Sequence, residues 1–296
     1  MRHVELLDGG TGEELFRLGV PDDRKTWSAY ALTHDEFHST VVEVHRSYLE
    51  AGATYITTNN YSVTPAAHFS REDIQKYVKL AGRLARDAIN SSPWTHPKHV
   101  CGSLPPLAES YRHDLVLPAA DAIPLYTIIG DALYPYVDFF LAETMSSIDE
   151  ARMAVEGVQH LGKPVFVSFT LRSDGALRSG ESAVDALATL QAFTTPDIRG
   201  ILFNCSEPEA ITIALRSLPP WSTSSKQLRR GAYANALTPV PDGWEMDGAA
   251  PQPFRTDLSP KEYLRHVQEW VELGATLVGG CCAVGPSHIQ VLHEAF

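Results

Sequence analysis

Short apolar runs recur along the chain, and most are followed by a stretch in which apolar residues are spaced three or four apart. Runs of four to six residues with many β-branched, aromatic and aliphatic side chains are typical of buried β-strands. Eight strands are predicted on this basis, at residues 4–7, 53–58, 98–101, 137–142, 164–169, 200–203, 231–234 and 275–278. The segments between them have the spacing of amphipathic helices.

The clearest helical segment is 36–51. It places Val41, Val44 and Tyr48 on one stripe, and Gly52 stands just past its end, where glycine commonly terminates a helix. The same criteria predict helices at 73–89, from Ser147 onward with acidic residues in the first turn, and from Ser259 to Leu273.

This alternation of strand and helix, repeated eight times, predicts an α/β fold, a single (β/α)8 TIM barrel in which residues 1–296 form one domain. An open, doubly wound sheet is the alternative. However, the residues after the first strand, Asp8-Gly9-Gly10-Thr11-Gly12, match neither a dinucleotide-binding fingerprint nor a P-loop. Two longer segments, 104–120 after the third strand and 236–258 after the seventh, are predicted to be long loops over the barrel mouth.

The composition narrows the class of partner. Lys and Arg number 24 against 36 Asp and Glu, and the net charge of −12 argues against nucleic acid or an anionic membrane as a partner. No apolar run has membrane-spanning length, and the N-terminus lacks the apolar stretch of a signal peptide, so a cytoplasmic location is expected. Small molecules are the expected partners, and the sequence leaves the oligomeric state open.

Polar residues collect at the carboxyl ends of the predicted strands. In a (β/α)8 barrel these ends meet at one rim, which is where active sites are found. The residues at these ends are Asp8, Asn59, Ser103, Glu143, Ser168, Asn204, Cys205, Asn235, Cys281 and Cys282. One polar loop residue says little, but the convergence of ten predicts a functional site at this rim.

Three of the four cysteines belong to this set. Cys205 ends the sixth strand and the pair Cys281-Cys282 ends the eighth, so the three thiols can meet across the rim. Three thiolates with one remaining position describe a catalytic, tetrahedral zinc site. Gly279-Gly280 are predicted to let the backbone turn so that both adjacent cysteines reach the ion. The alternative, a small buried apolar residue, suits the fourth cysteine, Cys101, which has no partner.

Such a site favours one kind of chemistry. A thiol bound in the fourth position is ionised at neutral pH because the ion stabilises the thiolate. With three anionic ligands zinc is a poor activator of water, so thiol alkylation is favoured over hydrolysis. No Ser-His-Asp or Cys-His arrangement competes, and none of the 12 histidines stands out as a general base.

The sequence resembles the homocysteine S-methyltransferase family nearly from end to end. The strongest signatures are Gly279-Gly280-Cys281-Cys282 followed by Gly285-Pro286-Ser287-His288-Ile289, and Phe203-Asn204-Cys205. Supporting matches lie at 8–15, 27–28, 51–59, 142–144 and 150–151. The chain departs from the family at Ala283, where glycine is usual, and at 233–237, which lacks the usual Pro and Gly.

The resemblance implies a methyltransferase of type EC 2.1.1, which methylates the sulfur of homocysteine and so serves methionine biosynthesis. It implies that Cys205, Cys281 and Cys282 hold Zn²⁺ and form the catalytic centre. It also implies that Asp8 and Glu143 bind the amino group of homocysteine, since an ammonium needs nearby carboxylates. Loop or helix capping is the alternative for these two. The expectation for Asn204 and Asn235 is that they bind the substrate or brace the site.

The methyl donor is expected to carry a positive leaving centre, because a neutral thioether or amine leaves readily. A sulfonium such as S-methylmethionine is favoured, with the quaternary ammonium betaine and S-adenosylmethionine as alternatives. Trp27, Tyr61, Tyr111 and Tyr233 are candidates for cradling such a cation, or are ordinary packing residues. Two other functions stay open. A zinc hydrolase is disfavoured by the all-sulfur ligands, and a non-catalytic zinc- or thiol-binding barrel is allowed by Ala283 and the altered loops.

Overall fold

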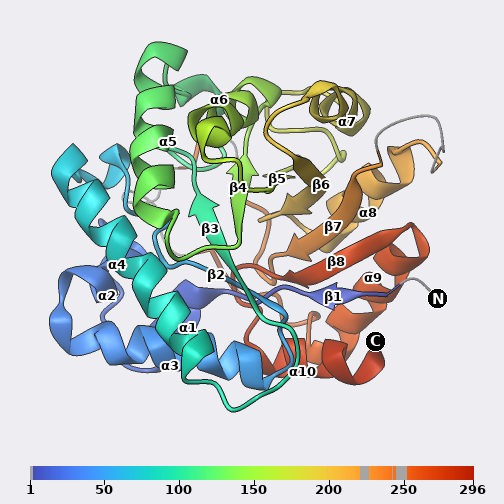
Figure 1. Ribbon diagram of the computed structural model, residues 1–296. Helices are drawn as coiled ribbons and strands as arrows, with labels where there is room; N and C mark the ends of the chain where they lie inside the picture. The colour runs from blue at the N-terminus through green and yellow to red at the C-terminus, as the bar shows by residue number, and fades with distance from the viewer. Residues whose placement is uncertain (1–2, 221–226, 242, 245–251) are drawn as a thin grey trace.

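Eight parallel strands form a barrel surrounded by helices in the computed structural model, which describes residues 3–220, 227–241, 243–244 and 252–296 (Figure 1). Adjacent strands pair in the order β1-β8-β7-β6-β5-β4-β3-β2. The barrel closes where Leu7 pairs in parallel with Tyr55, and where the Thr54 amide donates to the Leu6 carbonyl at 2.8 Å. The predicted (β/α)8 barrel is confirmed. Its strands are β1 Glu5–Leu6, β2 Tyr55–Thr57, β3 His99–Leu104, β4 Phe139–Met145, β5 Val165–Phe169, β6 Ile198–Asn204, β7 Arg229–Ala234 and β8 Ala275–Gly280.

Helices cover the outside of the barrel (Figure 1). Several begin at a serine whose hydroxyl accepts a hydrogen bond from the amide three residues on, and the predicted starts at Ser147 and Ser259 are confirmed in this way. The helix predicted from residue 73 begins earlier because Ser70 is its cap. The main helices are α1 Thr11–Arg17, α2 Tyr30–Thr33, α3 His38–Glu50, α4 Arg71–Asn90, α5 Ala119–Leu133, α6 Ile148–Val158, α7 Ala183–Ala192, α8 Pro208–Ser217, α9 Pro260–Glu272 and α10 Pro286–Ala295.

Several strands run further than predicted, and two of them, β3 and β4, matter most for the site. The structure extends β3 through Gly102 and Ser103, residues that the sequence pattern assigns to a turn, and it extends β4 through Glu143. Gly102 pairs with Phe140 of β4, and glycine is favoured there because helix α5 packs closely, so that a Cβ would lie 3.0 Å from a methyl of Leu133. The consequence for the site is that Glu143 stands on a rigid strand, where its position is better fixed than in a loop.

Apolar side chains fill two regions. One lies between the strands and the helices, and the other fills the barrel interior with one residue from or beside each strand. The interior cluster consists of Leu7, Tyr55, Cys101, Leu141, Phe166, Leu202, Tyr233 and Leu277. Cys101 is fully buried in this cluster, as expected for a packing residue. Among the described residues, no helix is both long and apolar enough to cross a membrane.

The loops after β3 and β7 are the long connections that the sequence predicts. The first contains a short 3₁₀ turn at His113–Leu115 before α5 begins. Parts of the second, residues 242 and 245–251, lie outside the described residues. The remainder is fastened to the barrel mouth, because Leu237 pairs with Phe254 and the Ala236 amide donates to the Cys282 carbonyl at 2.9 Å.

Candidate active site at the barrel mouth

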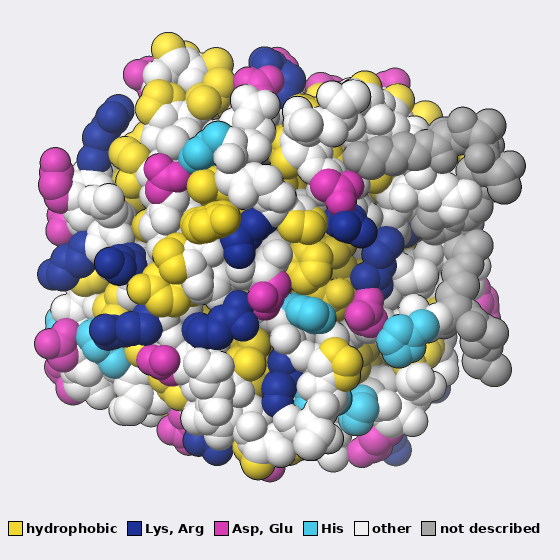
Figure 2. Space-filling model, viewed as in Figure 1, with side chains coloured by type: hydrophobic (Ala, Val, Ile, Leu, Met, Phe, Trp, Pro, Cys, Tyr) yellow, Lys and Arg dark blue, Asp and Glu magenta, His cyan; other side chains and the backbone are white. Residues whose placement is uncertain are grey.

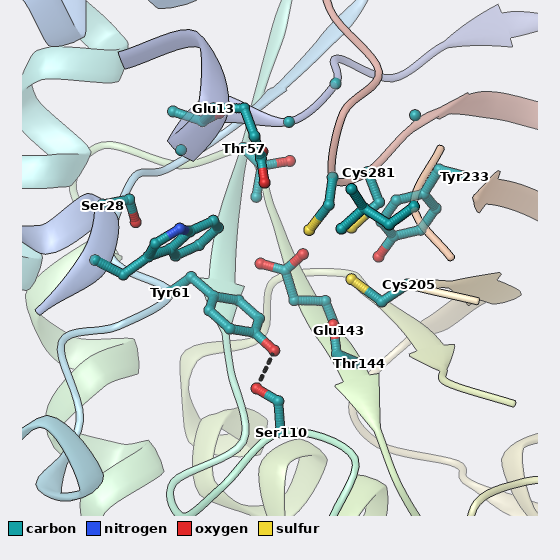
Figure 3. A pocket seen from close by; sticks show the side chains of 18 of the residues that line it. Glu13, Ser28, Thr57, Tyr61, Ser110, Glu143, Thr144, Cys205, Tyr233 and Cys281 are labelled. Atoms are coloured by element: carbon teal, nitrogen blue, oxygen red, sulfur yellow. Dashed lines mark hydrogen bonds between the residues drawn. The ribbon is translucent and has the colours of Figure 1, made fainter. Parts of the chain in front are cut away.

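A cavity of about 420 Å³ opens at the carboxyl ends of the strands. Its lining comes from the loops after β1, β2, β4, β6 and β8, together with parts of the long loops after β3 and β7. Figure 3 shows Glu143, Cys205 and Cys281 pointing toward this cavity from different strands. The convergence predicted for the carboxyl rim is therefore present in the fold.

The three cysteines of the predicted set meet in this cavity. The sulfurs of Cys205, Cys281 and Cys282 all lie within 4.8 Å of one another. Hydrogen bonds from the thiols of Cys281 and Cys282 lower the pKa of Cys205 well below its usual value, and the same bonds raise the pKa of the two donor thiols. A cluster of this kind can hold a metal ion.

Gly279 and Gly280 have a different role from the one predicted. Both are extended residues of β8, so they do not supply the turn. They are required because other groups come very close, since a Cβ on Gly279 would lie 2.6 Å from the Leu7 Cβ and one on Gly280 would lie 2.0 Å from a Val284 methyl.

The turn itself is made by the residues after the strand. The Val284 amide donates to the Cys281 carbonyl at 3.1 Å, and Ala283 has a φ of +64° at the third position of this turn. A positive φ at that position favours glycine. The family's usual glycine thus has a conformational reason, and Ala283 adopts the same turn with some strain.

Asp8 and Glu143 are buried carboxyl groups on neighbouring parts of the cavity wall. Asp8 accepts hydrogen bonds from the Thr57 amide at 2.7 Å and the Thr57 hydroxyl at 3.2 Å. Glu143 accepts one from the Ser103 hydroxyl at 2.5 Å. Burial raises the pKa of Asp8 to about 7 and that of Glu143 to about 8, with the charges of Cys205 and Asp8 contributing to the second shift. A bound cation would offset the desolvation of these two carboxylates.

Asn204 and Asn235 do not line the cavity that holds the three cysteines. Asn204 accepts hydrogen bonds from the Thr144 amide at 3.0 Å and from the Ser168 hydroxyl at 2.7 Å. Asn235 accepts one from the Cys282 amide at 3.2 Å. Their side chains therefore correspond to the bracing alternative, and direct contact with a substrate stays a prediction. Asn204 holds Thr144 at a φ of +60°, an unusual conformation for a β-branched residue.

The aromatic candidates line the cavity. Trp27 meets Tyr61 edge to face, with ring centroids 6.0 Å apart, and Tyr61 is held by a 2.8 Å hydrogen bond between its hydroxyl and that of Ser110 (Figure 3). Tyr111 and Tyr233 line the same cavity. These rings form an apolar wall beside the cysteines and carboxylates.

Several polar residues of the wall are not predicted from the sequence, among them Glu13 and Ser28. Neither stands at the end of a strand, where the sequence predicts the functional residues. Glu13 is in the first turn of α1, and the short Gly9-Gly10 segment directs this helix start to the cavity. The acidic residue directly after a Gly-rich turn was the available signal.

The fold and the site define a class of protein. It is a (β/α)8 barrel enzyme whose mouth combines a three-cysteine cluster, able to hold a metal, with buried carboxylates and an aromatic wall. The family model for homocysteine S-methyltransferases matches residues 5–296, and the chain belongs to this family.

Known proteins agree with this assignment. Homocysteine S-methyltransferase from Escherichia coli (strain K12) is 28% identical, over 98% of this chain and 94% of its own length. Homocysteine S-methyltransferase 1 from Brassica oleracea var. italica is 26% identical, over 97% of this chain and 91% of its own. The solved structure of the E. coli homocysteine methyltransferase MmuM in its metallated form has a TM-score of 0.82 at 24% identity, covers 100% of this chain and 97% of that one, and supports the fold.

Proposed function

We propose that this protein transfers a methyl group from a sulfonium donor to the sulfur of homocysteine, giving methionine. The observation that carries the proposal is the cluster of three cysteine sulfurs within 4.8 Å, in the same cavity as two buried carboxyl groups. The sulfur cluster suits activation of a thiol, and the carboxyl groups suit an amino-acid substrate. Family membership and the names of the relatives support the same reaction.

Zinc is the metal that we propose for the cluster. A tetrahedral zinc ion with Zn–S bonds of about 2.3 Å holds its sulfurs roughly 3.8 Å apart, which fits sulfurs that already lie within 4.8 Å. Cys205, Cys281 and Cys282 would hold the ion, and its Lewis acidity would lower the pKa of a homocysteine thiol bound beside them. Such a centre is sensitive to oxidation, so we propose the reducing cytoplasm as its location.

The residues of the chain then have separate tasks. Asp8 and Glu143 would bind the ammonium of homocysteine, because their buried carboxyl groups gain most from a cation. Asn204 and Asn235 would keep Thr144 and Cys282 in place by the hydrogen bonds described above. The homocysteine sulfur, having released its proton to solvent, would attack the methyl carbon. The bond from that carbon to the donor sulfur breaks, and the electron pair leaves with a neutral thioether.

The donor is proposed to be S-methylmethionine. A positive leaving centre would lie against the aromatic wall of Trp27, Tyr61 and Tyr111, where the ring faces attract cations. Betaine and S-adenosylmethionine carry the same kind of charge and are the alternatives to be tested.

The test is methyl transfer by reduced, zinc-loaded protein. The protein is incubated with homocysteine and, separately, with methyl-labelled S-methylmethionine, betaine or S-adenosylmethionine, and labelled methionine is measured by mass spectrometry. We expect labelled product with S-methylmethionine and none with the Cys281→Ala variant. Absence of product from all three donors at full zinc occupancy would refute the proposed reaction, and it would favour a barrel that binds thiols without turnover.

A further inference from the structure

Two further carboxyl groups line the cavity, those of Asp22 and Glu13, and Asp22 is paired with Arg24. Glu13, in the first turn of α1, lines the pocket, and its side chain points toward the region of Cys281 and Glu143 (Figure 3). Its Oε2 atom is shielded from solvent and has no hydrogen-bond partner among the described residues. Since an unsatisfied buried carboxylate oxygen is unfavourable by itself, its position suggests a ligand.

Glu13 is separate from the pair that we assign to homocysteine. Asp8 is fastened to Thr57 on β2, and Glu143 to Ser103 on β3. Glu13 instead faces the turn that follows β8, where burial raises the pKa of its carboxyl group and the nearby Ala283 amide and Cys282 partly offset the rise. Homocysteine has a single ammonium group, which the Asp8–Glu143 pair can bind. The carboxylate of Glu13 therefore remains for a second cation.

The segment that carries Glu13 packs against the aromatic wall. Trp27 packs directly on the adjacent Gly12, where a Cβ would lie 2.3 Å from the indole ring. Ser28, which is 1% exposed, also lines the cavity, and its hydroxyl has no partner among the described residues. Arg24 also lines the cavity, where its guanidinium lies 3.9 Å from the carboxylate of Asp22, another lining residue. Charged groups of both signs therefore line the cavity, as an amino-acid ligand with its ammonium and carboxylate requires.

Charge changes during the reaction decide which cation suits Glu13. The sulfonium loses its positive charge as the methyl group leaves, so a carboxylate beside it would stabilise the ground state more than the transition state. An α-ammonium keeps its charge throughout, so a carboxylate bound to it assists donor binding without slowing the transfer. We propose that Glu13 binds the α-ammonium of the methyl donor and thereby selects amino-acid sulfonium donors over donors without an amino group. This inference rests on the proposed function.

The test pairs a Glu13→Gln variant with two donors that differ by one group. The donors are S-methylmethionine and (3-carboxypropyl)dimethylsulfonium, which is the same molecule without its α-amino group. For S-methylmethionine we expect the variant to raise KM about tenfold or more, the usual effect of losing a hydrogen bond to a charged group, with kcat unchanged. For the deaminated donor we expect the same KM with both proteins. Equal effects on both donors would overturn the proposal.

Binding measurements test the role of Glu13 independently of whether the proposed reaction occurs. Calorimetric titration of S-methylmethionine into zinc-loaded protein without homocysteine should show the same weakening in Glu13→Gln, even if no methionine were ever formed. Zinc content and the affinity for homocysteine should be unchanged in the variant, and a loss of either would assign Glu13 to the metal or the acceptor instead. Glu14→Gln, in the same turn but outside the cavity lining, is the matched control and should leave donor binding unchanged.

Discussion

Replacing Glu143 by Gln should stabilise the metal-free protein while removing its affinity for homocysteine. The Glu143 side chain is only 8% exposed, and its pKa is raised from 4.5 to about 8, chiefly by burial. The folded state therefore keeps a proton on this carboxyl group up to a higher pH than the unfolded state does. Between these two values the unfolded chain binds fewer protons than the folded protein, so stability falls as the pH rises.

The size of the effect follows from the two pKa values. At pH 7 the unfolded carboxyl is almost fully ionised and the folded one is mostly protonated, which lowers the free energy of unfolding by about 3 kcal/mol relative to acidic solution. Glutamine does not titrate, and its amide oxygen can still accept the hydrogen bond from Ser103. The gain in stability on Glu143→Gln should thus be below about 1 kcal/mol at pH 5 and about 3 kcal/mol at pH 7.

The measurement is urea unfolding at pH 5, 7 and 8.5, with a reductant and a chelator present. Glu43→Gln on the exposed face of α3 is the control and should leave the curves unchanged. Homocysteine affinity is then measured on zinc-loaded protein by calorimetry. If the stability difference did not grow with pH, or if the variant were less stable at pH 7, the conclusion that burial of the Glu143 carboxylate destabilises the folded protein would be refuted. Unchanged homocysteine affinity would refute its binding role.

Three further predictions concern other parts of the structure. Ala283→Gly should raise stability by about 0.5–1 kcal/mol in urea unfolding, because glycine relieves the φ of +64° but loses more chain entropy on folding; lower stability would contradict the strain. His45 is fully buried with both ring nitrogens unpartnered among the described residues, and burial lowers its pKa to about 4. As the pH falls from about 6.5 toward 4, the unfolded chain takes up a proton on this histidine that the folded protein does not, so the free energy of unfolding decreases. Leucine does not titrate, so the gain in stability from His45→Leu should be about 2 kcal/mol larger at pH 5 than at pH 8. Asn235→Ala should weaken zinc binding by roughly 10- to 100-fold, measured by competition with a chromophoric chelator, and leave the donor KM unchanged.

The sequence predicts the barrel and the cysteine cluster because both rest on strong local signals. Apolar runs separated by helical spacing identify all eight strands. Cysteines are few in this chain, so three of them at the ends of strands β6 and β8 are a specific signal. The position of Glu143 at the cavity is also predicted, because this residue directly follows an apolar run. The strand that carries it, β4, nevertheless runs further than the apolar pattern indicates.

What the sequence does not reveal depends on tertiary packing. Glycine is typical of turns, yet Gly102 and Gly279 are strand residues. The need for glycine at these positions is explained only by the close approach of Leu133 and Leu7 in the folded protein. Glu13 lies in a helix and not at a strand end, and although it follows a Gly-rich turn, only the fold shows that the first turn of α1 faces the cavity. Asn204 lies at the strand end where it was expected, but which way its amide points is fixed by Thr144 and Ser168.

Strain is concentrated where the chemistry is proposed to occur. Among the described residues, the non-glycine positions with positive φ include Trp27, Tyr111, Thr144 and Cys205, all of which line the cavity, and Ala283, which follows the cysteine pair. Such conformations persist only when the surrounding fold enforces them, and at Thr144 the hydrogen bonds with Asn204 do so. The cavity also holds buried carboxyl groups that a cation would stabilise. Both features lower the stability of the free protein, and the second is relieved by ligands. Homocysteine, whose ammonium would pair with these carboxyl groups, should therefore stabilise this barrel, and thermal unfolding with and without homocysteine would measure the effect.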